Sequence, residues 1–323
     1  MPEMTSRRAL LTASAAIGLG ASQPTAKAQN PTRRVAFLGI SPGHPNVERF
    51  RLRLGELGWV EQRNLVIDMR FTKGDAASIA PLTSELLALR PDVFVAGNDT
   101  MAIPAAASTA TVPIVFAVGI DPVGYGVVNS LSHPGRNATG FSVGGSELGM
   151  KMLSLLKEAV PGMKVVGVLV GIRDRYKVES LDDARRQLGL DLVQFELTRP
   201  DEIDEAFQRF AKAGATGVMD FAAATTFDVR DRLAALALQY RLPMVVNSGL
   251  ADAGGLLAYG PSFPDMYRRT AELVDRVLRG AKPADIPVEL PTVYDFVVNL
   301  RTARALGVAL PQSVLLRATR VIE

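Results

Sequence analysis

Apolar and polar positions alternate along this chain as short apolar runs followed by amphipathic stretches. The run from Val35 to Ile40 is continuously apolar, which predicts a strand buried on both faces of a parallel sheet. Within residues 46–57, Val47, Phe50 and Leu54 recur at helical spacing, and a glycine follows as a helix terminator. A buried strand followed by an amphipathic helix is the repeating unit of a parallel α/β sheet.

The same succession continues to about residue 140 and then starts again. Further strands of the first half are predicted at 65–71, 93–96 and 114–118, and its further helices at 79–89 and 101–108. The second half predicts strands at 165–170, 192–197, 217–221 and 244–246, and helices at 148–160, 201–213 and 227–240. A chain of this length is at the size where two domains become common, so we predict two similar α/β lobes in tandem.

The first 28 residues differ in composition from the rest. Arg7 and Arg8 follow Ser6 and precede an uncharged segment, and Ala26-Lys27-Ala28 is a small-x-small pattern of the kind that signal peptidase cuts. The paired arginines favour a twin-arginine export signal, with the general route as the alternative. A membrane anchor is less consistent, because the uncharged run is shorter than the roughly 20 residues of a spanning helix. We predict a signal peptide at 1–28, cleavage near Ala28, and a periplasmic protein.

Charge and residue content argue against several function classes. The chain has 36 basic and 33 acidic residues, and removal of residues 1–28 takes away three basic residues and one acidic residue, leaving 33 against 32. Such a balance gives no support to a nucleic-acid or membrane-surface partner. There is no cysteine, and His44 and His133 both lie in Pro/Gly-rich turns, where a loop residue is a better interpretation than a metal ligand. With no nucleophile elbow, phosphate loop or dinucleotide fingerprint either, we predict no enzyme, no metal and no cofactor.

The C-terminal segment carries the most specific pattern. It begins YGPSFPDMYRRTAELVDRVLRG at Tyr259 and closes on PQSVLLRATRVIE at Glu323. It resembles the C-terminal segment of a family of ABC-transporter substrate-binding proteins that includes tryptophan- and tyrosine-binding members. The GIDPVG run at 119–124 and the TGFS run at 139–142 resemble further segments of that family. The resemblance implies a type I periplasmic-binding fold, which is α/β with two doubly wound parallel-sheet lobes joined by a three-strand hinge.

The resemblance also implies how the chain is divided between the lobes. The chain would return to the first lobe after residue 248, with a strand at 256–259 and a helix at 263–279, and cross back so that 296–300 pairs in the second lobe. The crossings would lie near Gly140, Asn247 and Pro291. The expected lobes are therefore 33–140 with 249–290, and 141–248 with 291–323.

Ligand-binding groups are expected in the loops that follow the strands. Ligands of open parallel sheets bind beyond the carboxyl ends of the strands, where helix N-termini offer unpaired N–H groups. The candidates in the first lobe are Ser41, Asn98, Asp99, Thr100, Asp121, Tyr125 and Ser142. Thr100 and Asp121 fit helix caps better than ligand contacts, because Thr and Asp are common caps and Pro122 suits a first helical turn. Tyr125 suits either stacking on a planar ligand or packing.

In the second lobe the candidate ligand-binding residues are Arg173, Arg175, Tyr176, Thr225, Asn247 and Ser248. Arg173 or Arg175 suits a bidentate clamp on a ligand carboxylate, and a solvated charged loop is the alternative. The small residues at 247–250 replace a bulkier and often charged pattern of the family, which predicts a roomier wall.

The function implied by the resemblance is that of a monomeric solute-binding protein that closes its lobes around one small organic ligand and delivers it to an ABC permease in the inner membrane. Amino acids, especially aromatic ones, are the first candidates, and small aromatic or aliphatic acids fit as well. A periplasmic sensor that presents its ligand to a receptor is the alternative. Exposed arginines are candidate permease contacts or solvated helix faces, namely Arg49, Arg51, Arg53, Arg185 and Arg186.

Overall fold

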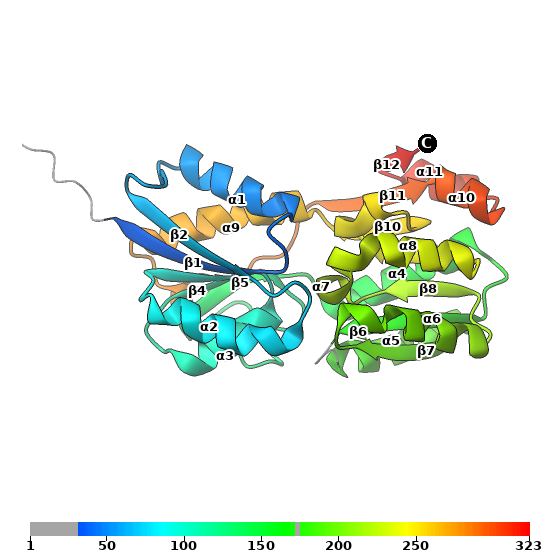
Figure 1. Cartoon of the computed structure of the whole chain (residues 1–323), viewed down its shortest axis with the longest axis horizontal. Coiled ribbons are helices and arrows are strands. Elements are labelled where there is room, and N and C mark those ends of the chain that lie inside the picture. The colour runs from blue at the N-terminus through cyan, green and yellow to red at the C-terminus, as the bar shows by residue number, and fades with distance from the viewer. Residues whose placement is uncertain (1–31, 172–174) are drawn as a thin grey trace, which may run out of the picture. The chain divides into compact units, whose positions relative to one another are not determined.

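A computed structural model describes residues 32–171 and 175–323 (Figure 1). These residues form two sheets, one of five strands in the order β2-β1-β3-β4-β5 and one of seven in the order β12-β11-β10-β9-β8-β6-β7. Non-consecutive neighbours such as β1 and β3 show the crossover connections of doubly wound sheets. Within the described ranges, no helix has both the length and the apolar character needed to cross a membrane.

The first sheet is parallel throughout and is covered by helices on both faces. Its strands are β1 (Arg33–Gly39), β2 (Leu65–Phe71), β3 (Val93–Ala96), β4 (Ile114–Gly119) and β5 (Ala138–Ser142). Its helices are α1 (Pro45–Glu56), α2 (Ile79–Ala88), α3 (Asp99–Ser108) and α9 (Phe263–Leu278). Val35 and Phe37 pack with residues of α1 and α9, while Ala36 and Leu38 pack with residues of α2 and α3. This alternation explains why β1 is apolar at every position from Val35 to Leu38: the helices on both sides of the sheet bury both of its faces (Figure 1).

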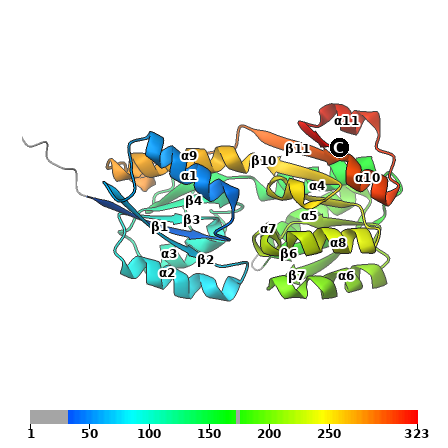
Figure 2. The same ribbon diagram turned by 45° about the horizontal axis from the view of Figure 1, so that its top comes forward.

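The second sheet repeats this arrangement with one antiparallel pair, β10 with β11. Its strands are β6 (Val165–Gly171), β7 (Asp191–Leu197), β8 (Gly217–Asp220), β9 (Met244–Asn247), β10 (Leu257–Pro261), β11 (Tyr294–Asn299) and β12 (Arg320–Ile322). Helices α4 (Gly145–Ala159) and α5 (Arg175–Leu188) pack on the face of Val166 and Val168, and α6 (Ile203–Lys212) and α8 (Arg230–Gln239) on the face of Leu169. Shorter elements are α7 (Ala223–Thr226), α10 (Leu300–Leu306), α11 (Gln312–Arg317) and the 3-10 turns η1 (Ala76–Ser78), η2 (Pro200–Glu202), η3 (Phe227–Val229), η4 (Ser248–Ala253) and η5 (Pro283–Asp285). Figure 2 shows β11 beside β10, with α10 and α11 next to them.

The expectation that residues 256–259 add a strand to the first lobe is wrong. β10 pairs in parallel with β9 and antiparallel with β11, so it belongs to the seven-stranded sheet; Tyr259 lies opposite Asn247 on one side and Phe296 on the other. After β9, the short turn η4 leads directly into β10, which pairs with β9. The crossing expected near Asn247 therefore lies after Pro261, where the chain enters α9 of the first sheet.

Three segments connect the two sheets, and they are bonded to one another. The chain passes from β5 to α4 at 143–144, from β10 to α9 at 261–263, and from η5 to β11 at 286–293. In the third segment Glu289 N–H donates to Gly140 O at 2.9 Å, and its carbonyl accepts from Ser142 N–H at 2.9 Å. Ser262 N–H donates to Val293 O at 2.9 Å, which links the second segment to the third.

Helix α9 packs beside α1 on one face of the first sheet, although it comes late in the chain. Trp59 Nε1 donates to Asp275 Oδ1 at 2.7 Å, and Arg53 Nε donates to Glu272 Oε1 at 3.0 Å. Met266 and Leu273 of α9 are buried in the same cluster as Phe50 of α1. The helix layer on this face of the first sheet is therefore completed by residues about 220 positions away from α1.

Candidate ligand-binding site

A cavity of about 610 Å³ lies beyond the carboxyl ends of strands from both sheets. Its walls come from the loops after β1, β2, β3, β4 and β5 of the first sheet, from Gly171 at the end of β6, and from the segments after β8, β9 and β10 of the second sheet. Its volume is typical of cavities that enclose a small organic molecule, and its place is the one that open parallel sheets offer to ligands. Apolar side chains dominate the lining, among them Ile40, Met101, Ile103, Val118, Ile120, Phe221 and Phe227.

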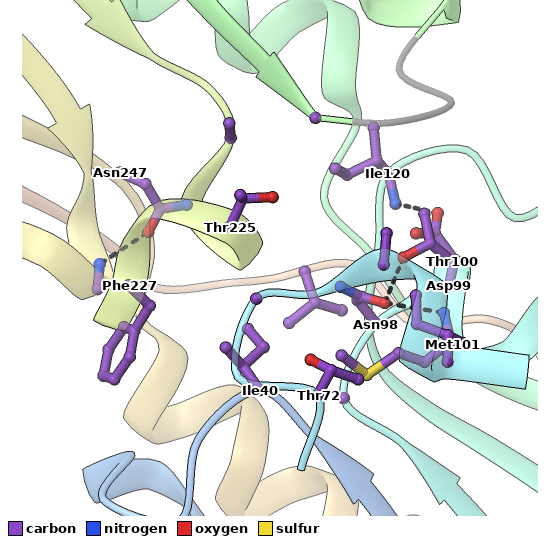
Figure 3. A pocket seen from close by; sticks show the side chains of 18 of the residues that line it. Ile40, Thr72, Asn98, Asp99, Thr100, Met101, Ile120, Thr225, Phe227 and Asn247 are labelled. Carbon is purple, nitrogen blue, oxygen red and sulfur yellow. Dashed lines mark hydrogen bonds between the residues drawn. The ribbon is translucent and has the colours of Figure 1, made fainter. Parts of the chain in front are cut away.

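The loop after β3 presents amide and hydroxyl groups to this cavity. Asn98 is the N-cap of α3: its Oδ1 accepts from Met101 N–H at 2.9 Å and from the Thr100 hydroxyl at 2.7 Å (Figure 3). The prediction that Thr100 caps this helix is therefore wrong, because the helix begins at Asp99 and the preceding residue supplies the cap. Asn98, Asp99 and Thr100 all line the cavity.

Asp99 ties the loop after β3 to the loop after β4. Its side chain is fully buried, and Oδ2 accepts from Ile120 N–H at 2.6 Å and Asp121 N–H at 2.9 Å. Asp121 in turn accepts at Oδ1 from Gly124 N–H at 2.9 Å. The sequence predicts that Asp121 caps a helix, and this is wrong: it caps a turn, because no helix lies between β4 and β5. It does not line the cavity.

A buried carboxylate also shapes the loop after β8. Asp220 Oδ1 accepts from Ala222 N–H at 2.9 Å, and its Oδ2 accepts from the Thr226 hydroxyl at 2.7 Å. These bonds position α7, from which Thr225 lines the cavity. After β9, Asn247 caps η4 by accepting from Gly249 N–H at 2.8 Å, and it too lines the cavity.

Three aromatic rings in the lining were not expected from the sequence. His44 stacks on Phe227, with ring centroids 4.4 Å apart and 25° between planes, and on Tyr267 at 5.7 Å and 17°. His44 is a loop residue, as predicted, and its Nδ1 accepts from Asn46 N–H as the N-cap of α1. Burial lowers its pKa to about 4, with Asp228 acting to raise the pKa and Arg230 to lower it further. The ring is therefore neutral at pH 7. Burial also raises the pKa of the Tyr267 hydroxyl.

Several predicted site residues lie elsewhere. Ser41, Tyr125, Ser142 and Ser248 are not in the lining of this cavity. Ser41 and Ser142 are buried, and the Ser248 hydroxyl donates to Pro261 O at 2.6 Å, which fastens η4 to the end of β10. Tyr125 packs against the apolar cluster beneath α3. Arg173 lies outside the described residues, as do the side chains of Arg175 and Tyr176.

The charge of the described lining is low. It contains no lysine or arginine, and its charged side chain is Asp99, which holds two backbone N–H groups. Among the residues that the structure describes, no group of three or more His, Asp or Glu side chains is arranged to hold a metal ion. Hydroxyls and amides also line the cavity, namely those of Thr72, Asn98, Thr100, Thr225 and Asn247.

Two helix-covered sheets with a cavity at their strand ends define a type I periplasmic-binding fold, as predicted. The chain belongs to the ABC transporter substrate binding protein family, whose sequence profile matches residues 47–322. This confirms the resemblance inferred from the C-terminal segment.

Individual relatives agree with this assignment. The chain is similar to a tyrosine-binding protein of Clostridioides difficile (strain R20291), with 24% identity over 302 residues that cover 89% of this chain and 85% of the relative. A conserved domain protein from Vibrio cholerae has a TM-score of 0.79 and 26% identity over 90% of this chain and 99% of its own. A domain from Streptococcus pneumoniae, solved in complex with L-Trp, has the same TM-score and 24% identity over 90% of this chain and 100% of its own.

Proposed function

We propose that this protein is the exported solute-binding component of an ABC importer and that its ligand is an amino acid or a similar small organic acid. The observation that carries the proposal is a cavity at the strand ends of both sheets in a chain of this family. Relatives described as binding tyrosine and as holding L-Trp make the aromatic amino acids the first candidates.

The composition of the cavity suits such a ligand. Apolar walls that include Ile40, Met101 and Phe227 offer a surface for an aromatic or aliphatic side chain. The amides and hydroxyls of Asn98, Thr225 and their neighbours offer partners for a polar head group. Because the two kinds of group come from both sheets, a bound ligand contacts both and favours the arrangement in which they are close.

The other parts of the proposal come from the sequence and the family. The 1–28 segment is proposed to direct export and to be removed near Ala28. An inner-membrane ABC permease is the proposed partner, and the protein is proposed to act as a monomer without nucleic acid. A clamp by Arg173 or Arg175 on a ligand carboxylate stays a prediction.

Ligand binding is tested by thermal denaturation of the mature chain against the twenty common L-amino acids and a set of aromatic acids, followed by calorimetric titration. We expect one chemical group of compounds to raise the melting temperature with one site per chain, because a ligand that binds only the folded state stabilises it. If no compound in either set raises the melting temperature, the proposed ligand class is wrong.

A cavity-filling variant with a matched control ties the binding to this cavity. Ile120→Trp places a large ring in the lining, whereas Leu52→Trp places the same ring on α1 at a side chain that is 60% exposed. We expect Ile120→Trp to abolish the ligand-induced shift and Leu52→Trp to retain it. Uptake of the labelled ligand by cells with and without the gene then separates import from sensing. Mass spectrometry of the periplasmic protein checks the cleavage site.

A further inference from the structure

Two asparagine side chains face the cavity from opposite sheets. Asn98 follows β3 of the five-stranded sheet, and Asn247 ends β9 of the seven-stranded sheet. Each is an N-cap, and each uses its side-chain oxygen for that role: Asn98 Oδ1 accepts from Met101 N–H at 2.9 Å, and Asn247 Oδ1 accepts from Gly249 N–H at 2.8 Å.

These capping bonds determine where the amide nitrogens point. A backbone N–H can only donate, so the atom that faces it has to be the oxygen, and the NH₂ group lies on the other side of the amide. At Asn98 the Thr100 hydroxyl gives the same oxygen a second donor at 2.7 Å. Figure 3 shows the nitrogen of Asn98 and that of Asn247 both pointing into the space between them. Within the described part of the chain, the side-chain hydrogen bonds of both asparagines are made by the oxygen and not by the nitrogen.

We propose that Asn98 and Asn247 form a pair of neutral donors that hold the carboxylate of the ligand from both sheets at once. The proposal rests on the function proposed above and adds the group of the ligand that is recognised. Two NH₂ groups offer four N–H donors, which matches the roughly four lone-pair sites of a carboxylate. The described lining has no lysine or arginine to take this role, and the Asp99 carboxylate is turned towards Ile120, away from the space between the two amides (Figure 3).

An acceptor held by both amides links the two sheets. Asn98 is fixed to the end of the first sheet by its cap, and Asn247 to the end of the second. A carboxylate between them makes its full set of hydrogen bonds only where both loops are close, so it favours that arrangement over others. An amine without the carboxylate would contact the apolar walls and leave both NH₂ groups without this acceptor.

Replacement by aspartate separates this role from capping. Aspartate is as good an N-cap as asparagine, so Asn98→Asp and Asn247→Asp keep the cap oxygen and exchange the NH₂ donor for a second, negatively charged oxygen. Asn98→Ser and Asn247→Ser are second variants, because serine also caps a helix but has no NH₂ group. Asn299→Asp is the matched control: Asn299 caps α10 by accepting from Thr302 N–H at 3.1 Å and does not line the cavity.

Calorimetric titration of the mature chain tests the pair, with thermal melts of each unliganded variant to confirm folding. The probes are the tightest of the twenty common L-amino acids and the amine that it gives by loss of its carboxylate, such as tyramine for tyrosine or tryptamine for tryptophan. We expect wild type to bind the amino acid at least about tenfold more tightly than the amine. Each aspartate variant should bind the amino acid about 10- to 100-fold more weakly than wild type, in line with hydrogen bonds to a charged group. The serine variants should show about a tenfold loss, and Asn299→Asp should show none.

The remaining outcomes overturn the proposal in distinguishable ways. Unchanged affinity in folded aspartate and serine variants at either position excludes the donor pair while leaving the proposed function intact. Equal affinity of wild type for the amine and the amino acid excludes the carboxylate as the recognised group. If wild type binds none of the amino acids and none of the aromatic acids, both the donor pair and the proposed ligand class are wrong.

Discussion

The Phe227 ring stacks on the His44 ring across the cavity wall, with 4.4 Å between centroids. His44 follows β1 of the first sheet and Phe227 follows α7 of the second, so the contact joins two parts of the cavity wall that come from different sheets. Tyr267 lies 5.7 Å from His44, and the guanidinium of Arg230 lies 4.9 Å from the centroid of Phe227. The histidine is therefore enclosed by aromatic rings and close to a fixed positive charge.

The free energy of unfolding should decrease as the pH is lowered from 6.5 to 4, because of His44. Burial lowers its pKa from 6.5 to about 4, so in this range the unfolded chain takes up a proton that the folded chain does not. Stability thus rises with pH across this window, and the total contribution is about 3 kcal/mol. Urea denaturation from pH 4 to 7 measures it. His44→Asn, which retains a capping side chain, should remove this part of the pH dependence, whereas His133→Asn in the exposed loop should leave it in place.

A double-mutant cycle should detect the stacking energy directly. Phe227→Leu keeps an apolar side chain in its buried position but removes the ring, and His44→Asn removes the other ring. Stacked aromatic pairs contribute about 0.5–1.5 kcal/mol beyond the area that they bury, so we expect a coupling energy in that range. Chemical denaturation of the two single variants and the double variant at pH 7 gives the value. A coupling energy near zero would show that the two rings are neighbours but do not stabilise each other.

Thr226→Val should destabilise the loop that carries Thr225. The substitution keeps the shape of the side chain but removes the hydroxyl that donates to the buried Asp220 carboxylate at 2.7 Å. Loss of a donor to a buried charged group costs about 1–3 kcal/mol, so the free energy of unfolding should fall by that amount, and ligand affinity should fall with it. Thr226→Ser is the control, since it retains the hydroxyl and loses only a methyl group. If the serine and valine variants were equally unstable, the hydrogen bond would not be the cause.

Gly140→Ala should be among the most damaging single substitutions in the first sheet. A methyl group at this position of β5 would lie 2.1 Å from Phe116 O and 2.5 Å from its ring, and the backbone oxygen cannot move without breaking the sheet. We expect a loss of roughly 3 kcal/mol or failure to fold. Gly55→Ala in α1 is the matched control, because nothing lies within 4 Å of its methyl group. Glycine is unfavourable in a helix, so this control should gain up to about 1 kcal/mol in thermal or urea denaturation.

Local periodicity predicted most strands and helices because their residues bury the faces that they share with their neighbours. The strand at Val93–Ala96, for example, has the predicted bounds. What periodicity cannot determine is which sheet a buried strand joins. The burial of Leu257 and Ala258 would be the same in either sheet, and only pairing with β9 and β11 places β10 in the second.

The lining of the cavity was predictable for residues that directly follow buried strands. Asn98 and Asn247 were found because polar residues after buried strands reach the ligand side of a parallel sheet. Ser41 and Ser142 also follow or end strands, but their burial away from the cavity depends on packing that the sequence does not reveal. His44 and Phe227 were missed because their contact joins residues from distant parts of the chain, and each alone is an ordinary loop or core residue.

The place of α9 has a consequence for the order in which the protein forms. Residues 263–278 form α9, which packs beside α1 on the same face of the first sheet. Trp59 and Arg53 can form their hydrogen bonds to Asp275 and Glu272 only after this helix has been made. All five strands of the first sheet are made by residue 142, but the helix layer on its α1 side is complete only when α9 follows β10. Until then α1 packs only on its own sheet, and the apolar side chains that α9 covers stay exposed, which makes chains truncated before residue 263 prone to association through that face.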